Sequence, residues 1–95
     1  MTINNSTIPN PAARAEAELT AALIVQGAQV LEQVKDIVDP SDFNLKKHRI
    51  IWETAFGLHD KGDTVDLMGI ANSLQEKGRL DAVGAGFLSK TADDA

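Results

Sequence analysis

Hydrophobic side chains recur every three or four positions along most of this chain, which is the spacing of one face of an α-helix. A first stripe covers residues 12–25, and Asn10 and Pro11 before it are typical of a helix start. Gly27 separates it from a second stripe over residues 28–37. Apolar and polar residues do not alternate in the manner of strands. The pattern therefore predicts helices and no sheet.

The strongest helical signal covers residues 45–61. At 100° per residue, His48, Trp52 and Leu58 fall within one arc that also holds Ile51 and Ala55. Gly62 is expected to end this helix. Phe43 precedes it, after a turn-forming cluster, and is expected to point inward as a plug.

A fourth helix is predicted over residues 67–77, with Asp66 as its N-cap. Gly78 is the expected stop, and Leu80 stands where a hydrophobic contact often follows such a stop. Residues 80–83 fit one short helical turn, and a last helix is predicted from about residue 85 to the end.

The expected fold is all-α: a compact bundle of five to six short helices around one core. Residues 1–11 are rich in Asn, Ser, Thr and Pro and are expected to form a flexible tail, so that residues 12–95 make up one helical head. The predicted core consists of Leu19, Leu23, Val34, Ile37, Phe43, His48, Ile51, Trp52, Ala55, Leu58, Ile70, Leu74 and Leu80.

The composition of the chain argues against several classes of ligand and site. The net charge of −5 disfavours duplex DNA as a primary ligand, and negligible binding of single-stranded DNA is expected. The absence of cysteine excludes disulfides and thiolate metal sites. Neither a membrane span nor a secretory signal is visible, which predicts a cytoplasmic protein without membrane contact.

No catalytic, cofactor or metal site is expected. Gly57 and Gly62 have the spacing of a phosphate-binding loop, but Asp63 stands where the lysine must be and would repel phosphate. His48 and His59 are about 16 Å apart along one helix and cannot share a metal ion. The chain by itself is therefore not expected to be an enzyme.

A partner surface is the remaining possibility. Ile50 is placed opposite the core arc of the third helix, Phe56 flanks that arc, and Glu53 lies between them in sequence. Exposed apolar residues at such positions are compatible with a helix-packing surface. A lone exposed isoleucine is equally common on a monomer, so the two readings stay open.

The order of these motifs resembles the N-terminal domain of the DnaB family of bacterial replicative helicases. The resemblance rests on Asp42-Phe43, His48-Arg49, Gly62, Val65-Asp66, Gly78 and Val83-Gly84, and it covers about residues 9–92. The sequence departs from the family pattern at Ala21, Asn44, Ala85, Phe87 and Thr91.

The resemblance implies a non-catalytic assembly and docking domain. Family heads pair weakly and form a collar on a hexameric ring, which receives primase or a helicase loader. The family's hairpin and motor are missing from this sequence. The motor would bind ATP and magnesium and drive 5′ to 3′ unwinding in DNA replication. Two alternatives remain: a free-standing regulator with the same fold, and a helix-turn-helix DNA-binding protein that reads DNA with residues 66–77.

Overall fold

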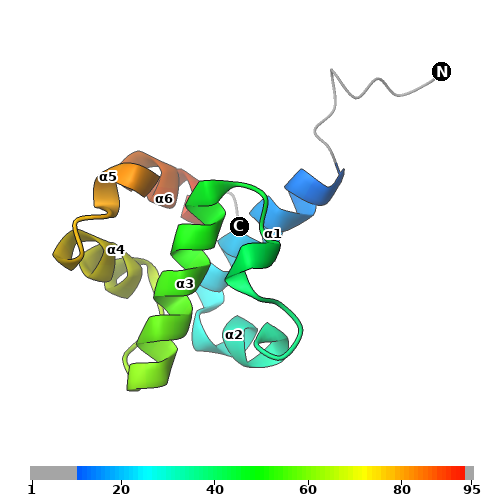
Figure 1. The fold of residues 1–95 in the computed structure, drawn as a ribbon, viewed down its shortest axis with the longest axis horizontal. Coiled ribbons are helices and arrows are strands. Elements are labelled where there is room, and N and C mark those ends of the chain that lie inside the picture. Colours follow the sequence, from blue (N-terminus) through cyan, green and yellow to red (C-terminus); the bar gives the residue numbers. More distant parts are fainter. Residues whose placement is uncertain (1–10, 94–95) are drawn as a thin grey trace.

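The computed structural model describes the backbone of residues 11–93 and the side chains of residues 14–93. Its elements in chain order are α1 (Pro11–Gln26), α2 (Ala28–Val34), η1 (Pro40–Asp42), α3 (Lys46–Lys61), α4 (Leu67–Glu76), α5 (Leu80–Val83) and α6 (Ala85–Asp93) (Figure 1). The described residues contain helices and no strand, which confirms the all-α prediction. The predicted tail lies outside the described residues except for Pro11, which already belongs to α1.

Helix α3 is the central element. It contacts α1, α2, η1, α4 and α5, and Figure 1 shows it with α4 and α5 on one side and α1 and α2 on the other. A helix surrounded in this way must be apolar on more than one face. Seven of its side chains are buried, including three consecutive ones from Ile50 to Trp52. The wide apolar surface of α3 thus makes it the scaffold on which the other helices pack.

Trp52 lies at the centre of the core and is fully buried. Its ring stacks on Phe43 with 4.9 Å between ring centroids, so Phe43 is the inward plug that the sequence predicts. The indole N–H donates a hydrogen bond of 3.0 Å to the hydroxyl of Thr20, which donates in turn to the carbonyl of Glu16. This chain of bonds satisfies the buried polar atoms and ties α3 to α1.

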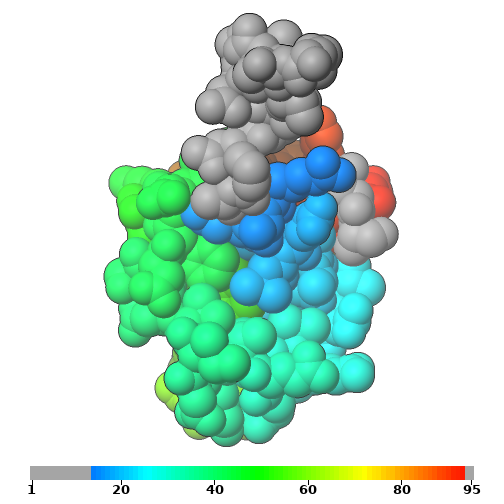
Figure 2. Space-filling model, turned by 90° about the vertical axis from the view of Figure 1, so that its right-hand side faces the viewer, coloured from blue at the N-terminus to red at the C-terminus, as the bar shows by residue number. Residues whose placement is uncertain are grey.

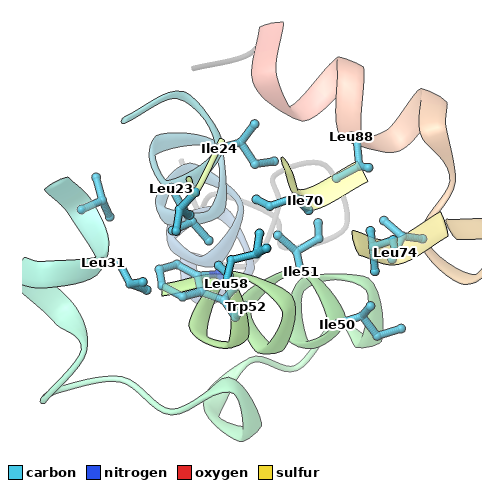
Figure 3. Packing of buried hydrophobic residues seen from close by; sticks show 14 of the residues in the cluster. Leu23, Ile24, Leu31, Ile50, Ile51, Trp52, Leu58, Ile70, Leu74 and Leu88 are labelled. Carbon is cyan, nitrogen blue, oxygen red and sulfur yellow. The ribbon is translucent and has the colours of Figure 1, made fainter. Parts of the chain in front are cut away.

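The structure places nearly all of the expected core residues inside (Figure 3). Leu23, Phe43, His48, Ile51, Trp52, Ala55, Leu58, Ile70 and Leu74 are buried, while Leu19, Val34 and Leu80 pack against the core at its margin.

Ile37 is the exception, because it is 78% exposed. The prediction assumed that the second helix reaches this residue, whereas α2 ends at Val34. The backbone N–H groups of Ile37 and Val38 both bond to the carbonyl of Val34 in a turn that leads toward Pro40. This turn replaces the last expected helical turn and leaves the Ile37 side chain in solvent.

The expected helix ends are present. Gly62 adopts the left-handed conformation after α3 (φ 79°), and Gly78 has a φ of 69° after α4. Asp66 caps α4, since its carboxylate accepts a 2.7 Å hydrogen bond from the backbone N–H of Gly69.

Gly27 joins α1 to α2 with a φ of 57° and is buried. A Cβ at this position would collide with the carbonyl oxygen of Val65, which precedes α4. The turn between the first two helices therefore packs directly on a distant backbone segment, which only glycine permits. Among the described helices, none is long and apolar enough to cross a bilayer.

Candidate functional site

Ile50 does not belong to a surface. It is 2% exposed, so its predicted place on an outer face of α3 is wrong. The helical wheel gave α3 one buried arc, but α4 and α5 cover a further side of this helix. Figure 3 shows Ile50 on the side of α3 toward Leu74 of α4. The residue contributes to the core and is unavailable to a partner.

The other two surface candidates, Phe56 and Glu53, line a shallow groove on α3. Val38 and Pro40 from the segment before α3 form its opposite side, and the hollow measures about 470 Å³. Phe56 is half-buried and lies against Trp52, with 6.2 Å between ring centroids. Glu53 is exposed. The groove therefore has an apolar floor that is continuous with the core.

Three carboxylates and one lysine line this groove: Asp39, Glu53, Asp60 and Lys35. Glu53 pairs with Arg79 of the segment before α5 at 3.3 Å, while Asp39 and Asp60 line the hollow itself. Hydrogen bonds from the backbone N–H and the hydroxyl of Ser41 lower the pKa of Asp39. A carboxyl with a lowered pKa stays ionised at neutral pH and is unsuited to act as a general acid. The groove thus presents apolar side chains beside carboxylates.

His48 lies in a separate cluster between α1 and α3. Its Nδ1 is 3.7 Å from a carboxylate oxygen of Glu16, which itself accepts hydrogen bonds from the backbone and side-chain nitrogens of Asn44. In Figure 2 the blue atoms of α1 lie beside the green atoms near the start of α3. Burial lowers the pKa of His48, and the nearby Glu16 opposes this shift.

His59 lies at the other end of α3, 3.1 Å from Glu32 of α2. The Lys35 ammonium beside Glu32 lowers the pKa of that carboxyl, and His59 contributes less. Within residues 14–93, no three His, Asp or Glu side chains come close enough together to hold a metal ion. The two histidines thus occupy separate environments.

Sequence reasoning missed four exposed large apolar side chains among the described residues, of which Val25 is 56% exposed on α1. Ile37 follows α2, Leu45 precedes α3, and Met68 is 72% exposed beside an apolar hollow between α4 and α6. The position of Met68 off the Ile70–Leu74 face was a usable signal. Ile37 gave none, because its spacing fits the stripe of the second helix.

Comparison with known proteins identifies the fold. Residues 8–95 match the model of the DnaB-like helicase N terminal domain. The chain belongs to this family. It is 34% identical over 82 residues to the Replicative DNA helicase DnaB of Buchnera aphidicola subsp. Schizaphis graminum (strain Sg), a match that covers 86% of this chain and 17% of the relative. The protein of the same name from Buchnera aphidicola subsp. Acyrthosiphon pisum (strain APS) is also 34% identical over 82 residues, which is 18% of its length.

The chain thus spans less than a fifth of the curated relatives that it matches. Most residues that carry the DnaB-like resemblance have structural tasks here. Phe43 stacks on the core tryptophan, Val65 is buried, Asp66 caps α4, and Gly62 and Gly78 end helices. These residues of the DnaB-like pattern therefore determine where helices begin and end and how the core packs.

Proposed function

We propose that this chain is a non-catalytic assembly and docking head of a hexameric replicative DNA helicase. The observation that carries the proposal is the family match over residues 8–95, which spans every described element. The curated relatives of that family are named as replicative DNA helicases. ATP and magnesium binding and 5′ to 3′ unwinding then belong to a motor outside this sequence, in a protein that works on DNA in the cytoplasm.

In this role the head associates weakly with other heads and offers a surface to primase or a helicase loader. The groove at Phe56 supports such contacts, because it combines an apolar floor with a rim of three carboxylates and Lys35. Exposed Ile37 lies next to Val38 of this groove in the chain. Small interfaces of less than ~1,200 Å² are typically transient. Self-association is thus expected only at high protein concentration.

Sedimentation equilibrium from micromolar to millimolar protein tests this association. The expected result is an average mass that rises from the monomer toward the dimer with concentration. A monomer mass across the whole range would contradict head-to-head association and leave only partner docking.

Reading the coding frame beyond codon 95 tests the larger assignment. A frame that continues to a Gly-x-x-x-x-Gly-Lys-Ser/Thr motif supports a helicase head, since that motif cradles phosphate. A stop codon at that point would favour the free-standing regulator, and capture of a helicase by the purified chain would then be the decisive assay. The family match supports either helicase-linked role over a helix-turn-helix regulator.

A further inference from the structure

Another hollow lies at the opposite end of α3 from Gly62, between α1, α6 and the first turn of α3. It measures about 450 Å³, which is within the usual range for ligand sites. Its floor is apolar and consists of Ala17 and Ala21 of α1, Leu45 and Phe87. Leu45 is 46% exposed although it is a large aliphatic residue. The floor can therefore take up an apolar side chain from outside.

The rim of this pocket is basic, although the chain carries a net charge of −5. Arg14 and Lys90 line it, and Lys47 holds its ammonium 4.8 Å above the ring of Phe87. Glu18 also lines the pocket and pairs with Arg14 at 3.1 Å, but both side chains are 69% exposed. Such exposed pairs are weak, so Arg14 remains available to another anion.

The first turn of α3 adds unsatisfied donors. Its N-cap is Leu45, whose side chain has no acceptor, and the turn contains Lys46 and Lys47 but no acidic residue. Cations at a helix N-terminus are unfavourable because they oppose the helix dipole, and the first backbone N–H groups need acceptors. An anion bound at this end would satisfy both requirements.

His48 forms part of the pocket wall beside the first turn of α3. Its side chain lines the pocket and is only 6% exposed, yet its Nδ1 is buried without a hydrogen-bond partner in the described structure. Glu16 at 3.7 Å is too far away and is engaged by Asn44. Buried polar atoms are rarely left unpaired, but this nitrogen faces Glu16, which does not line the pocket, and it therefore offers no contact to a ligand there.

We propose that this pocket binds a short acidic segment of a partner protein. One apolar side chain of the segment lies on the floor between Ala21 and Phe87, and its carboxylates face Arg14, Lys90 and the first turn of α3. The apolar floor favours a peptide over a nucleic acid, whose backbone offers charge without an aliphatic anchor. This inference rests on the proposed docking role, because it takes the acidic segment to belong to a docked protein.

Titration of the ¹⁵N-labelled chain tests the site directly. The probe is the peptide acetyl-Asp-Glu-Leu-Asp-Glu-amide, added at low salt. The expected result is a set of amide shifts confined to the first turn of α3 and to residues near Phe87 and Lys90. A peptide with serine in place of leucine should bind more weakly, and one with lysine in place of every acid should not bind.

Charge reversal locates the contact. Lys90→Glu should weaken binding of the acidic peptide by about fivefold or more, because it places a carboxylate at the rim. Lys77→Glu is the matched control, since Lys77 is an exposed lysine at the end of α4 and the change in net charge is the same. It should leave binding within error once the salt concentration is held constant.

Absence of shifts up to millimolar peptide would overturn the proposal, as would equal losses in the two variants. Stronger binding of a thymidine oligonucleotide at the same residues would replace the peptide with a nucleic acid and overturn it too. The titration is run on monomer and needs neither self-association nor a motor. If the peptide causes no shifts while the chain still self-associates, only the proposed pocket is rejected. The coding frame and sedimentation equilibrium test the proposed function separately.

Discussion

Trp52 shows how one side chain joins distant parts of this molecule. Its ring contacts Phe43 and Phe56, and its N–H reaches Thr20 in α1, thirty-two positions earlier in the sequence. The helical spacing predicts that the ring is buried. It gives no sign of Thr20 as the partner, because a threonine in a helix ordinarily faces solvent or its own backbone.

Trp52→Ala should lower the free energy of unfolding by about 3–5 kcal/mol, since it leaves a large cavity and removes the hydrogen bond to the hydroxyl of Thr20. Urea titration followed by circular dichroism measures the loss. Trp52→Phe is the companion variant, because it keeps most of the ring volume and removes the hydrogen bond. It should cost clearly less, and an equal cost or a negligible effect of the alanine change would contradict the central position of the ring.

His48 makes stability depend on pH. Burial lowers its pKa below the ordinary 6.5 in the folded chain, with Glu16 of α1 acting in the opposite direction. Between the folded pKa and 6.5 the unfolded chain therefore binds more protons than the folded one. The free energy of unfolding should thus fall as the pH drops below about 6.5.

Urea titrations at several pH values between 7.5 and 5.5 check this direction. In His48→Gln the decline over that interval should flatten, because the titrating group is gone. An unchanged decline in this variant would assign the pH dependence to other residues.

Ile37 and Ile50 mark the limit of residue-by-residue prediction. Each was assigned from its angle on a helical wheel, and each lies in the environment opposite to the one expected. The wheel contains no information on where a helix ends or how many neighbours surround it. Those two facts depend on contacts with distant segments, which one sequence does not display.

At the scale of elements, the most predictable helix boundaries are those marked by a capping side chain or by a glycine after the last turn. Gly62 ends α3, and Asp66 begins α4, at the expected positions because their backbone conformation or capping is local. Helix α2 has neither a side-chain cap at its start nor a glycine at its end. Its N-cap is Gly27, which has no side chain, and its C-cap is Lys35, which leads into a turn. Its boundary was therefore the one misjudged.

Substitution of alanine for glycine should have opposite effects on stability at two positions of this chain. Gly27→Ala should destabilise the fold by more than about 1 kcal/mol, because φ is positive and the new Cβ would meet the carbonyl of Val65. Gly57→Ala lies inside α3, where an added Cβ meets nothing within 4 Å, and should stabilise by about 0.5–1 kcal/mol.

Thermal unfolding followed by circular dichroism distinguishes the two variants. The melting temperature should fall for Gly27→Ala and rise for Gly57→Ala. A melting temperature that does not fall for Gly27→Ala would mean that the approach of the α1–α2 turn to Val65 is not a constraint on stability.

At the scale of the whole molecule, surfaces were harder to predict than the core. Apolar spacing predicts the all-α fold, and the order of motifs resembles the family; both are confirmed. A surface is assembled from several elements: the groove at Phe56 needs Val38 and Pro40, and the basic pocket needs α1, α3 and α6. The sequence pattern identified Phe56 and Glu53 but not the residues opposite them.

Head-to-head association should depend on the apolar side chain outside the Phe56 groove. Ile37→Glu is expected to reduce dimer formation strongly and leave the helical signal intact, because Ile37 is 78% exposed. Met68→Glu is the matched control at 72% exposure, on the far side of α3. Sedimentation equilibrium compares them, and an equal reduction in both would place the contact elsewhere or make it non-specific.

The sequence holds a single tryptophan, and that residue is shielded completely from water. The emission spectrum of this tryptophan therefore reports on the solvent exposure of the core, without a contribution from a second indole. Partners that settle on the outside should leave the emission maximum where it is, whereas a loosened interior should move it to longer wavelength. Tryptophan fluorescence can thus distinguish a variant whose core is unfolded from a folded variant that has lost only its association with a partner.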